Sequence, residues 1–188
     1  MIKFGTGGWR AVIGDDFTKA NIQLLAQGLV NKMKSEGVTE QGIVMGYDRR
    51  FLSKEAMQWA AEVFAAAQIK AYLINKSSPT PLVMFYVMKH DFPYGMMITA
   101  SHNPREYNGY KVYWEDGAQV TPPHDTGIMA EVAKVTSFDM VKTMEKEKAQ
   151  AEGLYQIISD DVDESYFAEL RNLSIHPEII KKMAKDIK

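Results

Sequence analysis

The sequence contains no cysteine and only four histidines among its 188 residues. Without cysteine the chain can form neither disulfides nor cysteine-ligated zinc, and thiolate catalysis is excluded. Four histidines also leave little material for a histidine-rich metal site. Catalysis by this chain must therefore rely on hydroxyl, carboxyl, imidazole and basic groups.

A large net charge and a long apolar run are absent as well. The chain has 22 Lys and Arg against 24 Asp and Glu, a net charge of −2, which gives no general attraction to nucleic acid or anionic lipid. No run approaches the ~20 apolar residues of a membrane span, and the start "MIKFGTGGWR" lacks the apolar core of a signal peptide. We expect a soluble cytoplasmic protein that binds neither nucleic acid nor membrane.

Hydrophobic residues make up 46% of the chain, enough for one domain with its own core. Strand-like and helix-like segments alternate along it, which predicts a layered α/β domain with a mainly parallel sheet. Ser53 is expected to cap the second helix. The helix-like segments are 18–37, 54–68 and 77–90, and the strand-like segments are 42–48, 70–75, 94–100 and 109–114.

The alternating pattern changes near residue 123. A helix, a charged segment and the short apolar run "YQII" follow, and the end of the chain predicts two helices, the second starting at Pro177. We expect a domain over residues 1–150 and a helical segment over 151–188.

The first polar motif is "FGTGGWR", residues 4–10. Closely spaced glycines free backbone N–H groups to point at an anion, and Arg10 adds a charge that can bind phosphate bidentately. The motif is neither a dinucleotide fingerprint, whose third glycine would stand at Arg10, nor a P-loop, whose Gly-Lys-Ser/Thr ending it lacks. The alternative is a purely structural turn.

The second motif is "GYDRRFLSKE", residues 46–55, at the end of a predicted strand. Ligands bind at the carboxyl ends of strands in open α/β sheets, so Asp48 and Arg50 are candidates for the site. The alternative is an ion pair that steadies the turn before the next helix.

The third motif is "TASHNPREYNGYKVYW", residues 99–114. Ser101 stands at a strand end, and His102 beside it has an unperturbed pKa near neutrality, suited to acid–base work. A serine-hydrolase elbow needs glycine two residues on either side, where this chain has Thr99 and Asn103. The alternative is that the serine and asparagine only cap the backbone of a tight turn.

Lys111 follows the turn predicted at "EYNGY", so a hairpin-like return brings its ammonium group back towards Ser101. A serine, a histidine, a lysine and a glycine-arginine loop suit a phosphoryl group better than an acyl group.

These motifs carry a resemblance to a known family. "TASHNPREYNGYK" resembles the phosphoserine loop of the α-D-phosphohexomutases, "FGTGGWR" their "FGTSGxR" segment, and "GYDRR" their "GxDxR" turn. The three motifs stand in the family's order. The resemblance implies the family's first domain, a three-layer α/β/α domain with a mixed, mainly parallel sheet, followed here by C-terminal helices.

The resemblance also implies roles. Ser101 would carry the phosphoryl group that moves between the 1- and 6-positions of a hexose phosphate through a bisphosphate, and its phosphate would supply one ligand to Mg²⁺. Arg10, His102 and Lys111 match catalytic positions beside that phosphoryl group. The matching phosphate- or substrate-binding positions are Thr6, Gly7, Gly8, Asp48, Arg50 and Asn103. Gly7-Gly8 stands where many relatives have Ser-Gly.

Three motifs of the family's other domains are missing: the "DGDxDR" metal loop, the "GExSG" sugar loop and the last phosphate-binding loop. We therefore expect a first domain that is inactive without the remaining domains of a parent enzyme, which would supply the other Mg²⁺ ligands. A glucose 1,6-bisphosphate-type activator is implied too. The alternative is a stand-alone phosphosugar-binding or phosphocarrier module without mutase activity.

Overall fold

The computed structural model describes residues 2, 4, 8–158 and 161–186. Contacts divide the chain into two compact units, Met1–Ile158 and Ser159–Lys188. The first unit extends past residue 150, where the sequence suggested a boundary, because the strand Tyr155–Ile158 pairs with the rest of its sheet.

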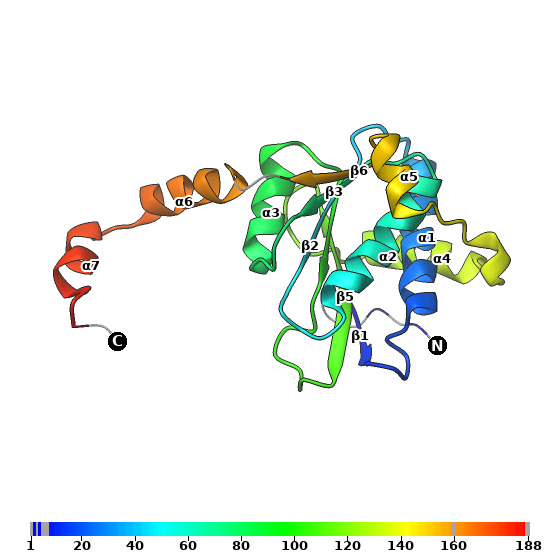
Figure 1. Ribbon diagram of the computed structural model, residues 1–188, viewed down its shortest axis with the longest axis horizontal. Helices are drawn as coiled ribbons and strands as arrows, with labels where there is room; N and C mark the ends of the chain where they lie inside the picture. The colour runs from blue at the N-terminus through cyan, green and yellow to red at the C-terminus, as the bar shows by residue number, and fades with distance from the viewer. Residues whose placement is uncertain (1, 3, 5–7, 159–160, 187–188) are drawn as a thin grey trace. The chain divides into compact units, whose positions relative to one another are not determined.

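The first unit is built on a six-stranded sheet with the order β1-β5-β4-β2-β3-β6 (Figure 1). Its strands are β1 Trp9–Val12, β2 Ile43–Tyr47, β3 Ala71–Ile74, β4 Tyr94–Ile98, β5 Tyr107–Trp114 and β6 Tyr155–Ile158. The contacts β2–β3, β2–β4 and β3–β6 are parallel, whereas β5 runs antiparallel to both of its neighbours. The mixed, mainly parallel sheet is confirmed.

Helices cover both faces of this sheet. Figure 1 shows α3 on one face and α1, α2, α4 and α5 on the other, so the expected three-layer α/β/α arrangement is confirmed. The helices of this unit are α1 Lys19–Glu36, α2 Ser53–Ala66, α3 Thr80–Lys89, α4 His124–Lys134 and α5 Lys146–Ala151, with a 3-10 turn at Phe138–Met140.

Helix α1 shows how local sequence sets these elements. The hydroxyl of Thr18 accepts a hydrogen bond from the amide of Asn21, which caps the start of the helix at 3.3 Å. Gly37 ends it in the left-handed conformation, with φ 72°. Between them, Leu25 and Leu29 lie on the helix face buried in the main core.

Two glycines let α3 approach the sheet closely. A Cβ atom on Gly46 of β2 would lie 2.5 Å from Val83 of α3, and one on Gly95 of β4 would lie 2.5 Å from Val87. Because glycine has no side chain at these two positions, the two valines of α3 can pack directly against strands β2 and β4.

Three local expectations were wrong. Trp9–Val12 is a strand, although the sequence predicted only a loop there. Asn108 and Gly109 lie inside β5 rather than in a turn, and the chain reverses in the loop of residues 101–106. Ser53 does not cap α2, whose N-cap is Leu52 without a side-chain cap, because the Ser53 hydroxyl donates instead to Asp48.

The second unit contains two helices, α6 Asp161–Leu173 and α7 Pro177–Met183, as predicted, with Pro177 in the first turn of α7. In the part of the chain that the structure describes, every helix is too short or too polar to cross a bilayer.

Candidate functional site

The candidate site lies at the carboxyl edge of β2 and β4. Tyr47 and Ile98 face each other at the ends of these strands, and the amide of Asp48 donates to the carbonyl of Ile98 at 3.1 Å. The loop that begins with Asp48 therefore lies beside the loop of residues 101–106. Parallel strands place two motifs from distant parts of the sequence at one edge.

Ser101 adopts a left-handed backbone conformation, with φ 57°. Its amide donates to the hydroxyl of Thr99 at 3.0 Å, and the amide of Asn103 donates to the carbonyl of Ala100 at 3.1 Å. Its own side chain is exposed, and its Oγ lies 3.4 Å from Nδ1 of His102, which is also exposed. The loop presents a hydroxyl to the solvent with an imidazole beside it.

Arg10 reaches the same loop from β1. In the register of the sheet it faces Gly109 of β5, and its Nη1 donates to Oδ1 of Asn103 at 2.6 Å. A Cβ atom on Gly109 would lie 2.6 Å from the carbonyl oxygens of both Thr99 and Trp9. Glycine is required there because the end of β4 and strand β1 approach it from either side.

Lys111 lies two residues along β5 from Gly109, so it is on the same face of the sheet as Arg10. Burial lowers the pKa of Lys111, and the neighbouring Arg10 cation lowers it further. Gly8 fits tightly against this position, since a Cβ atom there would lie 2.4 Å from the carbonyl oxygen of Tyr110. Within the described ranges, no carboxylate is hydrogen-bonded or ion-paired to Arg10 or Lys111.

Arg50 is hydrogen-bonded to the backbone of the loop of residues 101–106, which we call the serine loop. Its Nη1 donates to the carbonyls of Pro104 at 2.8 Å and Tyr107 at 2.9 Å. Its Nη2 donates to the carbonyls of Ser101 at 2.9 Å and Asn103 at 2.5 Å. One guanidinium group thus joins three carbonyls of the loop that follows β4 and the carbonyl of Tyr107 at the start of β5.

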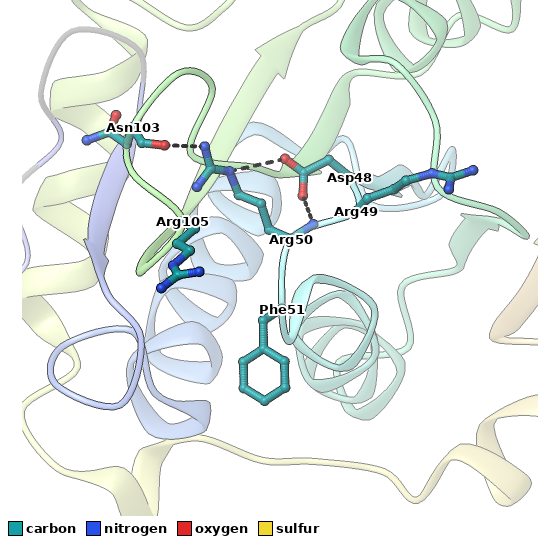
Figure 2. A pocket seen from close by; sticks show the side chains of 6 residues that line it. All are labelled: Asp48, Arg49, Arg50, Phe51, Asn103 and Arg105. Atoms are coloured by element: carbon teal, nitrogen blue, oxygen red, sulfur yellow. Dashed lines mark hydrogen bonds and ion pairs between the residues drawn. The ribbon is translucent and has the colours of Figure 1, made fainter.

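Asp48 orients this guanidinium, as Figure 2 shows. Its Oδ2 lies 3.6 Å from Nε of Arg50, and its Oδ1 accepts from the amide of Arg50 at 2.9 Å and from the hydroxyl of Ser53 at 2.8 Å. Asn108, which is completely buried, donates to the Ser53 hydroxyl at 2.8 Å and to the carbonyl of Phe51 at 3.0 Å.

Sequence reasoning gave Ser53 only the role of a helix cap and missed Asn108 as a residue that supports the site. The pair Asn108-Gly109 lies in an otherwise strand-like run, and its residue types favoured a turn. Asn108 was therefore not predicted as a site residue.

A hollow of about 590 Å³ lies between the two loops (Figure 2). It is lined by Asp48, Arg49, Arg50, Phe51, Asn103 and Arg105. Arg49 and Arg105 are exposed, and within the described residues neither guanidinium has a hydrogen-bond or ion-pair partner.

The structure gathers most of the sequence-predicted residues in one place. Arg10, Lys111 and Asn103 meet from β1, β5 and the serine loop, and Asp48 and Arg50 join that loop from the end of β2. Among the described residues, the side chain of His102 has a hydrogen-bond partner only in Ser101. Thr6 and Gly7 lie outside the described residues.

The described residues do not form a Mg²⁺ site by themselves. They contain no group of three or more His, Asp or Glu side chains placed to hold a metal ion. Mg²⁺ prefers several oxygen ligands, and the carboxylate of Asp48 beside the serine loop is already held by Arg50 and Ser53.

Comparison with known proteins gives a consistent result. Residues 1–139 match the family model described as phosphoglucomutase/phosphomannomutase, alpha/beta/alpha domain I. A probable phosphoribomutase of Schizosaccharomyces pombe is 41% identical over 140 residues, covering 71% of this chain and 24% of that protein. The phosphopentomutase of Homo sapiens is 31% identical over 189 residues, covering 95% of this chain and 31% of that protein.

Among solved structures, a putative phosphomannomutase from Thermus thermophilus superposes with a TM-score of 0.76 at 29% identity. The superposition covers 91% of this chain and 36% of that one. The chain thus spans about a quarter to a third of the length of the curated relatives that it matches.

Proposed function

Because the chain belongs to the phosphoglucomutase/phosphomannomutase family, as its domain I, we propose that it is the first domain of a sugar-phosphate mutase in which Ser101 carries the phosphoryl group. The observation that supports this most directly is the pair of cations, Arg10 and Lys111, beside an exposed serine and without a carboxylate partner in the described residues. The two like charges disfavour each other, and an anion between them would offset that repulsion; a phosphoserine carries about −1.5 to −2 charges near neutral pH.

In the proposed reaction a sugar hydroxyl oxygen forms a bond to phosphorus while the bond between phosphorus and Oγ of Ser101 breaks. The proton of the sugar hydroxyl would pass to a base of the complete site, and a proton would reach the leaving Oγ of Ser101; His102, with Nδ1 3.4 Å from that oxygen, is the candidate for the second transfer. The bisphosphate formed then returns its other phosphoryl group to Ser101. Arg10 and Lys111 would offset the charge that the transferring group spreads over its oxygens.

The lowered pKa of Lys111 fits this role. Its two causes are burial and the Arg10 cation, and a phosphate between the two cations would oppose the second cause. We therefore expect the pKa of Lys111 to rise when Ser101 becomes phosphorylated. The lysine would be fully charged in the state in which it must hold the phosphoryl group.

The proposed substrate is a sugar phosphate. The family name favours a hexose phosphate, whereas the two curated relatives described above are named for pentose or ribose phosphates. A pentose phosphate is therefore the second candidate. Turnover of glucose 1-phosphate against ribose 1-phosphate by the complete enzyme distinguishes the two.

The remaining domains of a parent enzyme would complete the site. They would supply the other ligands of Mg²⁺, to which a phosphate on Ser101 contributes one oxygen. The residues of the described part of this chain supply no such ligand set of their own. A bisphosphate activator of the glucose 1,6-bisphosphate type would load the serine at the start.

Phosphoryl labelling tests the assignment of Ser101. The complete enzyme is incubated with glucose 1,6-bisphosphate, digested with trypsin, and the peptide of residues 90–105 is sequenced by fragmentation mass spectrometry. We expect one phosphoryl group, on Ser101, and none in the Ser101→Ala variant, with the fold of that variant checked by circular dichroism. A label on Thr99 or Tyr94 would contradict the assignment.

Alanine substitutions test the two cations in the same enzyme. Arg10→Ala and Lys111→Ala should each remove about 2 to 4 kcal/mol of transition-state stabilisation, at least about a 30-fold loss of turnover. Lys34→Ala is the matched control, because Lys34 is an exposed cation at the end of α1, outside the hollow and without a partner in the described residues. Losses below about tenfold at both Arg10 and Lys111 would give these residues a purely structural role.

The 188-residue chain alone should not interconvert glucose 1-phosphate and glucose 6-phosphate in a coupled assay. A mutase must enclose the bisphosphate and exclude water, and this chain offers one side of that enclosure. Turnover that disappears in Ser101→Ala would refute the proposal that further domains are required. Phosphosugar binding by the complete protein without turnover would favour the alternative, a binding or phosphocarrier module.

A further inference from the structure

We propose that Arg50 is a positioning residue that fixes the conformation of the serine loop and does not itself bind a phosphate group. The proposal concerns the loop of this chain, and it rests on the proposed function only where it predicts an effect on phosphoryl transfer.

The first argument for this proposal is that the N–H donors of Arg50 are already used within the protein. A guanidinium group has five N–H donors and no acceptor. The two donors of Nη1 and the two of Nη2 are directed at three loop carbonyls and the carbonyl of Tyr107, and the one on Nε faces Oδ2 of Asp48. Figure 2 shows the head group between Asn103 and Asp48. All four Nη donors are thus engaged and the carboxylate of Asp48 lies in front of the fifth, so phosphate could bind the Nη groups of Arg50 only by displacing the loop.

The second step is the conformation that these bonds hold. Ser101 has φ 57°, a left-handed conformation that is unfavourable for a non-glycine residue and persists only where surrounding contacts enforce it. Nη2 of Arg50 binds the carbonyls of Ser101 and Asn103, so the backbone on both sides of His102 is fixed by one group. The direction of the serine hydroxyl and the imidazole therefore depends on this guanidinium.

The third step is the anchoring of Arg50 itself. Asp48 is held by the hydroxyl of Ser53, which in turn accepts from the buried amide of Asn108 in β5. The Ser53 hydroxyl uses its single proton towards Asp48 and a lone pair towards Asn108, so each group has a defined partner. The loop is thereby tied through Arg50, Asp48 and Ser53 to a buried residue of β5.

Arg10 and Arg49 differ from Arg50 in this respect. Arg10 has one hydrogen bond in the described residues, to Asn103, which leaves donors for a phosphate. Arg49 is exposed and has no partner there, so it has the same charge, one residue away, without the connection to the loop.

Amide hydrogen exchange of the 188-residue chain tests the proposal without any activity. In Arg50→Ala the amides of Ser101, Asn103 and Tyr107, which are hydrogen-bonded within or beside the loop, should exchange at least about tenfold faster, while amides of β4 keep their protection. Arg50→Lys should resemble Arg50→Ala, because one ammonium group cannot reach four carbonyls. Arg49→Ala should leave all of these rates unchanged.

Two results of this experiment would overturn the proposal. Unchanged loop amides in Arg50→Ala would mean that the loop holds its conformation without the arginine. Equal loss of protection in the loop and in β4 would mean that Arg50 supports the whole sheet. Either result leaves the labelling test of Ser101 unaffected, so failure here is separate from failure of the proposed function.

Kinetics of the complete enzyme give a second readout. Arg50→Ala should lower kcat by at least about tenfold while KM for the sugar phosphate stays within about twofold, since no ligand contact is lost. A low, non-denaturing concentration of guanidinium chloride should restore part of the activity to Arg50→Ala and none to Arg10→Lys. An increase in KM with unchanged kcat would identify Arg50 as a ligand-binding residue and contradict the proposal.

Discussion

Gly109 is the position where a single methyl group should disturb both the sheet and the site. A Cβ atom there would lie 2.6 Å from the carbonyl oxygens of Thr99 and Trp9, whereas such carbon–oxygen contacts normally need about 3.3 Å. Both obstacles are backbone atoms, so no side-chain rotation can relieve the overlap. Strand β1 at the edge of the sheet must move away from β5, which weakens their pairing and displaces Arg10.

Overpacking of this kind costs about 1–3 kcal/mol, and the upper end applies because the backbone itself must shift. Gly109→Ala should therefore lower the free energy of unfolding by about 3 kcal/mol, and the melting temperature by about 6–12 °C in a chain of this size. Urea unfolding followed by tryptophan fluorescence measures the loss, since Trp9, Trp59 and Trp114 all lie in the unit Met1–Ile158.

The matched control is Gly127→Ala in helix α4. Its added methyl group would meet only the flexible end of Lys32, with Cε at 3.1 Å, and alanine is favoured over glycine in a helix by about 1 kcal/mol. We expect unchanged or higher stability. A loss below about 1 kcal/mol in Gly109→Ala, measured beside this control, would refute the close approach of the two carbonyls.

Two further substitutions test buried polar groups in the same unfolding assay. The hydroxyl of Tyr110 is completely buried and has no hydrogen-bond partner in the described residues, so Tyr110→Phe should leave stability unchanged or raise it by about 1 kcal/mol. A loss of that size would reveal a partner. Burial raises the pKa of Glu62 above 4.5, despite the opposing charge of Lys19, so stability should fall as rising pH deprotonates it. Glu62→Gln should remove this decline. If stability depends on pH in the same way in the variant as in the unmodified chain, Glu62 is not its cause.

The sequence predicted the elements whose signals are local. Helix α1 has an apolar face, a threonine cap and a terminal glycine within one short segment, and buried strands such as β2 are apolar runs between turn residues. Strand β1 has four residues and follows a glycine-rich motif, so its identity depends on pairing with β5. Pairing between strands this far apart in the sequence produces no hydrophobic periodicity in the local segment, so the local sequence does not predict the strand.

The parts of the candidate site that consist of side chains could be predicted from the sequence. The parts that consist of backbone groups could not. Arg10, Ser101 and Lys111 could be proposed from residue type and motif spacing. The partners of Arg50 are main-chain carbonyls, which every residue possesses, so no residue type marks them. The pair Asn108-Gly109 predicted a turn because its residue types favour turns, whereas here the strands leave space only for glycine.

The antiparallel pairing of β1 with β5 also sets an order of events during synthesis. Trp9 leaves the ribosome about a hundred residues before its partner Tyr110, an interval of roughly 5–20 seconds at ordinary rates of translation. Throughout that time β1 lacks its partner strand β5, while α1, β2, α2, β3 and α3 are already emerging. Arg10 is thus made among the first residues of the domain and reaches Asn103 only after β5 has been added to the sheet.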